Sequence, residues 1–178
     1  MNSVVRSGKA VPLAQMEPQF FKGLAAAQKY FEPLKSSLGS DFPLNLKDPR
    51  GCELLKRMAV KADVLLENYA PGVMSKNGVG WEVMSKLNPR LVYASGTGYG
   101  LDGPDRDNLA MDLTVQAASG VMSITGFPDG PPVKAGAAFV DFMGGIHLYA
   151  GVVTALYERT ITGRGRLVEI AMQETVYP

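Results

Sequence analysis

The sequence predicts an α/β fold in which helices flank a parallel sheet on both faces. Three short apolar runs of β-type composition lie at 64–67, 91–95 and 167–171. Helix-type periodicity occupies the segments between them, and strands that alternate with helices are typical of parallel sheets. A chain of 178 residues can bury a hydrophobic core of its own. We therefore expect a partial doubly wound sheet with flanking helices in residues 44–178.

Two helices are predicted before the first strand. In residues 17–36, aromatic and aliphatic residues recur at three-to-four spacing, so residues 1–43 are expected to form a divergent helical segment. From residue 44 the order becomes regular. Asp48 is a helix-capping residue and Pro49 fits the first helical position, which predicts a helix that begins there.

The same alternation continues to the end of the chain. A short helix over 81–87 stops at Asn88 and Pro89, directly before the second strand. Another helix is predicted over about 111–119, and a long apolar helix over about 144–160 precedes the third strand. This order is typical of part of a Rossmann-like sheet.

Composition excludes several classes of function. A net charge of +1 does not favour binding to nucleic acid or to an acidic membrane surface. The N-terminus lacks the apolar core of a signal peptide, and no stretch approaches the ~20 uncharged apolar residues that span a bilayer. Cys52 is the only cysteine, which excludes an internal disulfide and fits a reducing compartment. We expect a water-soluble, cytoplasmic chain.

Ligand sites in sheets of this class lie past the carboxyl ends of the strands, where residues 68–72 and 96–100 stand. The glycines of 96–100 match a dinucleotide-binding fingerprint poorly, so a tight turn is the simpler interpretation. His147, the only histidine, lies in an apolar helix and is expected to be a core residue. No Cys/His cluster has metal-ligand spacing, so we predict no metal site.

Asp141 has the most informative surroundings in the chain. Small residues lie on both sides of it, and an apolar stretch with helical spacing follows closely. An aspartate in this place either caps the helix, where the positive end of the dipole favours its charged form, or acts as a carboxylate nucleophile. Spacing alone favours the cap and leaves both interpretations open.

Five blocks between residues 44 and 176 carry a family pattern. They are 45-NLKDPRGCELL-55, 62-ADVLLENYAPGVMSKNGVGWE-82, 88-NPRLVYASGTGYGLDGP-104, 111-MDLTVQAASGVMSITGFPDGPP-132 and 160-TITGRGRLVEIAMQE-174. In this order, together with Asp141, they resemble the class III CoA-transferases, the group that contains formyl-CoA and carnitine-CoA transferases. The family's catalytic aspartate corresponds to Asp141, so the resemblance favours the nucleophile over the cap.

The resemblance also implies residues that hold coenzyme A, the expected co-substrate. The family's Glu-Asn-Phe/Tyr-x-Pro-Gly stretch contacts this molecule, which makes Asn68, Tyr69 and Ala70 candidate contacts. Lys76 stands where the family often has an arginine near the nucleotide. A lysine there is a flexible point charge rather than a bidentate partner for phosphate.

The implied reaction transfers coenzyme A from an acyl-CoA to a small carboxylic acid. Asp141 attacks the thioester to give a mixed anhydride, and the released thiolate then forms an aspartyl-CoA thioester. Asp112 stands where the family often has an acid near the nucleophile, which implies contact with substrate; capping of the helix that follows it is the alternative. Gly144 and Gly145 are candidate N–H donors to the developing oxyanions, on local composition.

Two departures from the family keep other functions open. Related acyl-CoA racemases have a proton-transferring histidine where this chain has Met111, so transfer is favoured over racemisation. Full-length relatives also possess an opening glycine-containing turn and a smaller domain that residues 1–178 do not show. The chain is therefore expected to be the core of a large domain, truncated at both ends, and either a weak enzyme or a non-catalytic fragment. A homodimer or larger homo-oligomer is expected, because relatives are dimeric and an uncovered sheet edge needs cover.

Overall fold

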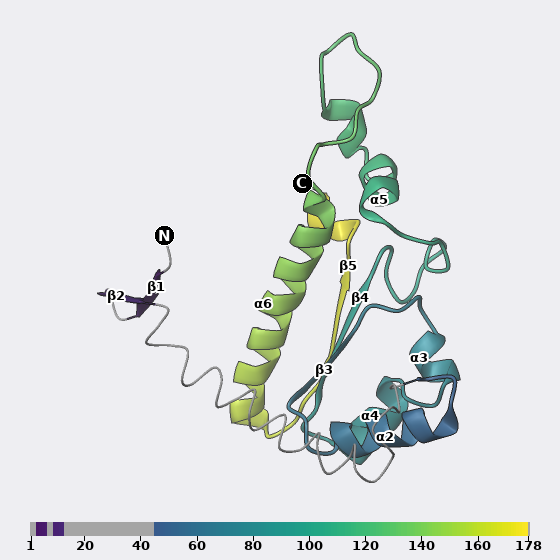
Figure 1. Ribbon diagram of the computed structural model, residues 1–178, viewed down its shortest axis with the longest axis vertical. Helices are drawn as coiled ribbons and strands as arrows, with labels where there is room; N and C mark the ends of the chain where they lie inside the picture. Colours follow the sequence, from purple (N-terminus) through teal and green to yellow (C-terminus); the bar gives the residue numbers. More distant parts are fainter. Residues whose placement is uncertain (1–2, 7–8, 13–44, 178) are drawn as a thin grey trace. The chain divides into compact units, whose positions relative to one another are not determined.

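The structure is a computed structural model that describes residues 3–6, 9–12 and 45–177 (Figure 1). The chain divides into two compact units, Met1–Pro43 and Leu44–Pro178. In the first unit, β1 (Ser3–Arg6) pairs antiparallel with β2 (Lys9–Pro12). These two strands were not predicted from the sequence, and the helix predicted over 17–36 lies outside the described residues.

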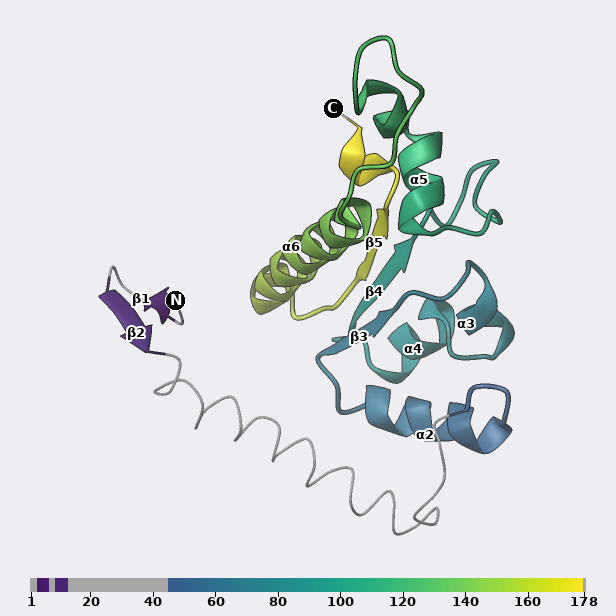
Figure 2. The same cartoon turned by 45° about the horizontal axis from the view of Figure 1, so that its top comes forward.

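The second unit is built on a parallel sheet with the strand order β3-β4-β5, which confirms the predicted fold class (Figure 2). The strands are β3 (Val64–Glu67), β4 (Val92–Thr97) and β5 (Leu167–Ala171). Glu67 pairs in register with Ser95 of the central strand. Because all three strands run in one direction, their carboxyl ends meet at one edge of the sheet.

One face of the sheet is covered by α2 (Pro49–Ala59) and α4 (Trp81–Leu87), with the short α3 (Val73–Lys76) close by (Figure 2). Helix α2 begins where predicted, because the side chain of Asp48 accepts the N–H of Arg50 at 2.9 Å. The core between these helices and the sheet contains Cys52, Ala59, Leu65, Met74, Val79, Met84, Leu91 and Tyr93.

The long helix α6 (Phe139–Thr162) covers the opposite face and packs along β4 and β5 (Figure 1). Gly151 makes this close packing possible, since a Cβ there would lie only 2.7 Å from Cγ1 of Val168. At the far end of the helix, Arg159 donates to the carbonyl of Arg90 and to the carboxylate of Asp63, both at 2.8 Å. The helix is thus anchored at its carboxyl end to the segments that lead into β3 and β4.

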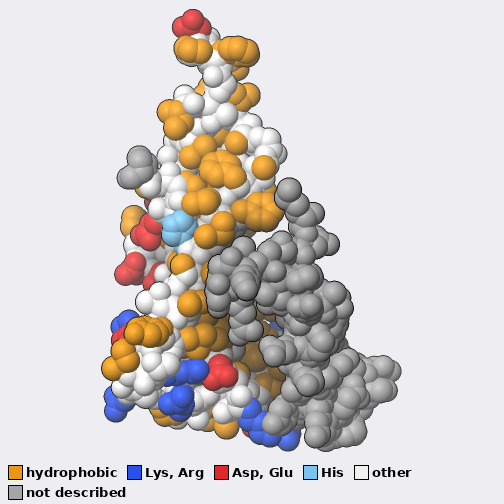
Figure 3. All heavy atoms as spheres, turned by 90° about the vertical axis from the view of Figure 1, so that its left-hand side faces the viewer, with side chains coloured by type: hydrophobic (Ala, Val, Ile, Leu, Met, Phe, Trp, Pro, Cys, Tyr) orange, Lys and Arg blue, Asp and Glu red, His pale blue; other side chains and the backbone are white. Residues whose placement is uncertain are grey.

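The outer side of α6 carries an unbroken stripe of exposed apolar side chains. Figure 3 shows hydrophobic side chains gathered on this face. The stripe, which we call the α6 stripe, consists of Phe142, Ile146, Tyr149, Val153, Tyr157 and Ile161, each between 45% and 74% exposed. By length and composition α6 is also apolar enough to cross a membrane, with 22% of its most apolar window buried. This apolar helix is longer than predicted from the sequence, because it begins at Phe139 rather than near residue 144.

Residues 98–138 connect β4 to α6 and lie outside the sheet. This connection contains α5 (Asp112–Ala118), as predicted, and a 3-10 turn, η1 (Val121–Ile124). A second 3-10 turn, η2 (Glu174–Val176), follows β5 and contacts α6. The connection places the start of α5 beside the carboxyl ends of β3 and β4, where these segments line a cleft.

Candidate active site

A cleft of about 530 Å³ opens at the carboxyl edge of the sheet. Its walls come from the loop after β3, the end of β4, the segment that leads into α5 and the first turn of α6. Crevices outside the carboxyl ends of parallel strands are the usual ligand sites of this fold class. The lining residues are Asn68, Tyr69, Ala70, Pro71, Gly96, Thr97, Gly98, Asn108, Leu109, Ala110, Met111, Asp112, Leu113, Lys134, Ala138, Asp141 and Met172.

Asp141 lies in this cleft, in the first turn of α6, and its side chain is exposed. It does not cap the helix, because the capping position is occupied by Ala138, whose side chain makes no capping hydrogen bond. The interpretation of Asp141 as the cap is therefore wrong. Its carboxylate instead lies near the positive end of a 24-residue helix, which favours negative charge at that place.

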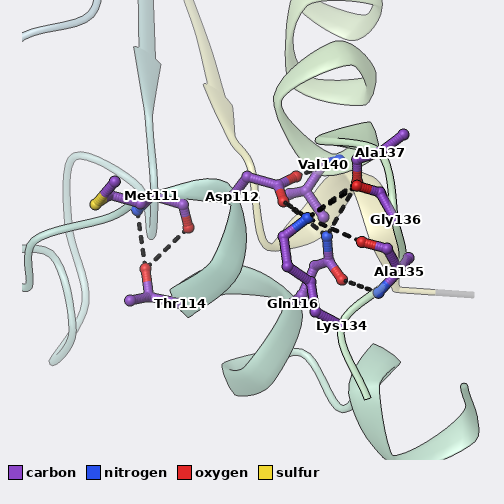
Figure 4. A network of polar contacts seen from close by, with 9 residues as sticks. All are labelled: Met111, Asp112, Thr114, Gln116, Lys134, Ala135, Gly136, Ala137 and Val140. Atoms are coloured by element: carbon purple, nitrogen blue, oxygen red, sulfur yellow. Dashed lines mark hydrogen bonds and ion pairs between the residues drawn. The ribbon is translucent and has the colours of Figure 1, made fainter.

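Asp112 supplies the cap that α6 lacks (Figure 4). Its Oδ1 accepts the backbone N–H of Val140 at 3.0 Å, while its Oδ2 accepts from Nε2 of Gln116 at 2.7 Å. Oδ2 also lies 3.5 Å from Nζ of Lys134. Asp112 also lines the cleft, so its expected contact with substrate stays a prediction, whereas its alternative role as the cap of α5 is wrong. The cap position of α5 is held by Met111, whose N–H donates to the hydroxyl of Thr114 at 2.8 Å.

Glu67 organises the other wall of the cleft and was missed by sequence reasoning. One carboxylate oxygen accepts the hydroxyl of Ser95, and the other accepts the backbone N–H of Tyr69 at 2.8 Å. The carboxylate thereby fixes the loop after β3, where Asn68 and Ala70 also line the cleft. The available signal in the sequence was an acid at the end of an otherwise apolar strand; in the structure this acid is only 9% exposed.

Tyr93 lies on β4 two residues before Ser95 and is buried. Its hydroxyl has no hydrogen-bond partner among the described residues. Burial raises the pKa of the Tyr93 phenol well above its ordinary value, and the nearby charge of Glu67 raises it further. Trp81 meets the Tyr93 ring edge-on, with ring centroids 6.2 Å apart.

The end of β4 approaches the cleft wall too closely for a side chain. A Cβ on Gly98 would lie 2.0 Å from Cβ of Ala110, so glycine permits the segment before α5 to pack here. Two residues later, Gly100 has a positive φ of 99° and its N–H donates to the Thr97 hydroxyl at 2.9 Å. Gly96 and Thr97 thus end β4, and residues 98–100 bend away directly after the strand, which agrees with the simpler interpretation of these glycines as a turn at a strand end.

Four of the residues singled out in the sequence lie away from the cleft walls. Lys76 is in α3 and does not line the cleft. Gly144 is buried, and a Cβ there would lie 3.2 Å from Cγ of Met172. Gly144 and Gly145 follow the first turn of α6, so their N–H groups belong to the helical hydrogen-bond ladder and are unsuited to bind an oxyanion. His147 is exposed rather than buried, and its Nδ1 lies 2.8 Å from the carbonyl of Met143.

Sequence reasoning also missed Lys134 and the segment 108–110 as cleft residues. Lys134 is the one basic side chain among the described residues that line the cleft. Its Nζ lies 2.8 Å from the carbonyl of Ala135, besides its contact with Asp112. Within residues 45–177, no three His, Cys, Asp or Glu side chains come together as metal ligands.

Comparison with known proteins shows the family to which the chain belongs. Residues 13–178 match the model of CoA-transferase family III, so the match begins well before residue 44, where the resemblance in the sequence was expected to start. The chain is 46% identical over 130 residues to acetyl-CoA:oxalate CoA-transferase of Acetobacter aceti, covering 72% of this chain and 33% of that protein. It is 45% identical over 147 residues to formyl-CoA:oxalate CoA-transferase of Streptomyces avermitilis, covering 83% of this chain and 36% of that protein.

Solved structures share the fold of this chain. A CAIB/BAIF family protein from Brucella suis superposes with a TM-score of 0.68 at 36% identity, covering 74% of this chain and 35% of the other. A hypothetical protein from Mycobacterium tuberculosis gives a TM-score of 0.69 at 34% identity, covering 74% and 37%. The chain spans about a third of the length of the curated relatives it matches. On the family match and these identities, the chain belongs to CoA-transferase family III.

Proposed function

We propose that this chain supplies the nucleophile-bearing half of a site that transfers coenzyme A between an acyl-CoA and a carboxylic acid. The observation that carries the proposal is the position of Asp141. An exposed carboxylate at the start of α6 shares one cleft with the loop 68–71 and with the turn that ends β4. A charged carboxylate that is open to the cleft can attack a thioester held against these two segments.

In the proposed reaction, a carboxylate oxygen of Asp141 attacks the thioester carbonyl and expels the coenzyme A thiolate. The thiolate then attacks the aspartyl carbonyl of the mixed anhydride and releases the acyl group as a free acid. An acceptor carboxylate reverses these two steps and leaves as its CoA thioester. Covalent intermediates divide a difficult exchange into easier steps. The N–H groups of Phe139 and Asp141, which the helical ladder leaves unbonded, replace Gly144 and Gly145 as the candidate donors to the oxyanions, because the N–H of Val140 already bonds Asp112.

For the acceptor we propose a small dicarboxylic acid. The relatives are named as transferases that act on oxalate, and a third relative, 41% identical, is named succinyl-CoA–L-malate CoA-transferase beta subunit. Oxalate and malate are both dicarboxylates. Lys134 would attract such an anion, since its ammonium group lines the cleft and is 36% exposed. Asn68, Tyr69 and Ala70 remain the proposed contacts of coenzyme A, and Lys76 a more distant one.

We further propose that the chain associates through the α6 stripe in the cytoplasm. Six exposed apolar side chains in a row are more than a solvated helix usually carries. The opposite side of α6 packs on β4 and β5, which favours an interface with protein over a membrane span. A second copy of this chain is the proposed partner. The single cysteine, Cys52, supports a reducing setting.

The experiment that tests the transfer reaction detects the covalent intermediate directly. The full chain is incubated with acetyl-CoA or formyl-CoA and analysed by peptide mass spectrometry. We expect a coenzyme A adduct on the peptide that contains Asp141 and none in Asp141→Asn, because an amide is not a carboxylate nucleophile. The exposed Asp129→Asn is the matched control and should keep the adduct.

An adduct that forms equally well in Asp141→Asn, with deamidation excluded, would show that the nucleophile is misassigned. Absence of any adduct at saturating acyl-CoA would reject catalysis by this chain and favour a non-catalytic module. A racemase has less support, because Met111, at the position of the proton-transferring histidine, is 70% exposed and has no proton to exchange.

A further inference from the structure

Gln116 is fully buried, yet both polar atoms of its side-chain amide have hydrogen-bond partners beside the start of α6 (Figure 4). We propose that Gln116 is a positioning residue that holds the first turn of α6 in place, and Asp141 with it, by acting through Asp112. The importance of this role for chemistry rests on the proposed function of Asp141. The mechanical part of the inference can be tested without any reaction.

The contacts of Gln116 join two separate segments of the chain. Its Nε2 donates to Oδ2 of Asp112 at 2.7 Å, and its Oε1 accepts the backbone N–H of Ala135 at 2.9 Å. A longer contact of 3.5 Å links Nε2 to the carbonyl of Ala137. Residues 135–137 lead directly into α6, so this one side chain ties α5 to the segment before the long helix.

An amide is needed at this position because the site demands a donor and an acceptor at once. The carboxylate of Asp112 can only accept, and the N–H of Ala135 can only donate. A glutamine side chain meets both with its two ends. A methionine of similar length offers no donor and only a weak acceptor, and an ionised glutamate would place a second negative charge against Asp112.

The effect of Gln116 reaches Asp141 through the cap of α6. The helix has no capping side chain of its own at Ala138, so the N–H of Val140 depends on Oδ1 of Asp112. Asp141 is the next residue. If Asp112 loses its bond to Gln116, the Asp112 carboxylate can turn toward Lys134 and release Val140. Displacement of a reacting group by about 1 Å can reduce the rate about a hundredfold, so a fixed first turn matters to the proposed attack.

The test measures amide hydrogen exchange by NMR in the full chain, without substrate. In Gln116→Met we expect the amides of Ala135 and Val140 to exchange about tenfold faster, the amount expected for loss of one hydrogen bond. Amides in β4 should keep their protection. Arg159→Met, which releases the opposite end of α6, is the control and should leave Val140 unchanged.

Rescue by a conservative variant separates positioning from general damage. In Gln116→Glu at neutral pH, we expect fast exchange at Ala135 and Val140, after correction for intrinsic rates. As the pH falls, a proton bound between the introduced carboxyl group and Asp112 restores a donor, so protection should return; Lys134 is the third charged group that faces them. Gln116→Met has no proton to gain and should show no recovery.

Unchanged exchange at Val140 in both variants would overturn the inference. Equal loss of protection across β4 and α6 would also overturn it, because it would show that Gln116 only supports the core. If the Met variant does not fold, the pH dependence of the Glu variant decides alone. These results do not depend on Asp141 chemistry, so they stand apart from the adduct experiment.

Discussion

The carboxylate of Asp112 and the backbone N–H of Val140 form a 3.0 Å hydrogen bond across 28 residues of sequence. Through this bond, the first residue of α5 caps a helix other than its own. The bond is buried, and Asp112 is only 7% exposed. Because the cap comes from α5, the first turn of α6 needs no capping side chain at Ala138. Ala138 and Asp141 both line the cleft, so the small alanine leaves space beside the carboxylate.

The borrowed cap should be measurable as stability. Asp112→Ala removes the acceptor for Val140 and for Gln116, so two buried donors lose their partner. We expect the free energy of unfolding to fall by about 1–3 kcal/mol, measured by urea denaturation. Asp112→Asn keeps one oxygen for Val140 and should lose less. The exposed Asp107→Ala should cause no measurable change, and equal stability of all three variants would contradict the capping role.

Glu67 should matter through its hydrogen bonds rather than its charge. In Glu67→Met the hydroxyl of Ser95 and the N–H of Tyr69 both lose their acceptor, which should cost about 1–3 kcal/mol in urea denaturation. Glu67→Gln can still accept from Tyr69 and can donate to the Ser95 hydroxyl, so its loss should be much smaller. A Gln variant as unstable as the Met variant would show that the charge itself is required.

The parallel sheet could be predicted from local sequence, because each strand is a short apolar run bounded by recognisable stops. The predicted strands 64–67 and 167–171 match β3 and β5, and the central strand extends to Thr97. The start of helix α2 could likewise be predicted from Asp48 and the proline that follows it. The residues that form such a signal lie within a few positions of each other, so a single sequence is enough to predict the element.

The site was harder to predict because its contacts join distant segments. Nothing local in the sequence pairs Asp112 with Val140, or Gln116 with Ala135. The start of α6 was placed too late because its cap is not adjacent in sequence, and this error made Asp141 look like the cap. The burial of His147 was misjudged for a related reason: an apolar helix need not be buried on all sides, and this one exposes the α6 stripe.

The α6 stripe should control self-association. Ile146→Glu with Tyr149→Glu places two charges in the centre of the stripe, where burial against a second copy would require their desolvation. We expect the sedimentation coefficient at high micromolar concentration to fall to that of a monomer. His147→Glu adds negative charge to the same helix outside the stripe and should leave association unchanged. A wild-type chain that is already monomeric would reject the proposed interface.

The buried phenol of Tyr93 should make the fold sensitive to alkaline pH. An unfolded tyrosine titrates at about pH 10, and the pKa of Tyr93 is raised in the fold, mainly by burial and further by the charge of Glu67. Stability from this difference is fully present below about pH 10 and is lost as the pH rises above it, because the unfolded chain releases the proton first.

Tyr93→Phe tests this directly, since it keeps the ring against Trp81 and removes a buried hydroxyl that has no partner among the described residues. At neutral pH we expect stability to stay equal or to rise by about 1 kcal/mol, measured as the urea midpoint. Between about pH 9 and 11 the variant should lose less stability than the wild type. The exposed Tyr157→Phe is the matched control and should follow the wild type. Glu67→Gln should lower the pKa of Tyr93 but leave it raised, because burial is the larger cause. If Tyr93→Phe and the wild type lose stability in parallel as the pH rises, the phenol of Tyr93 does not carry the alkaline transition.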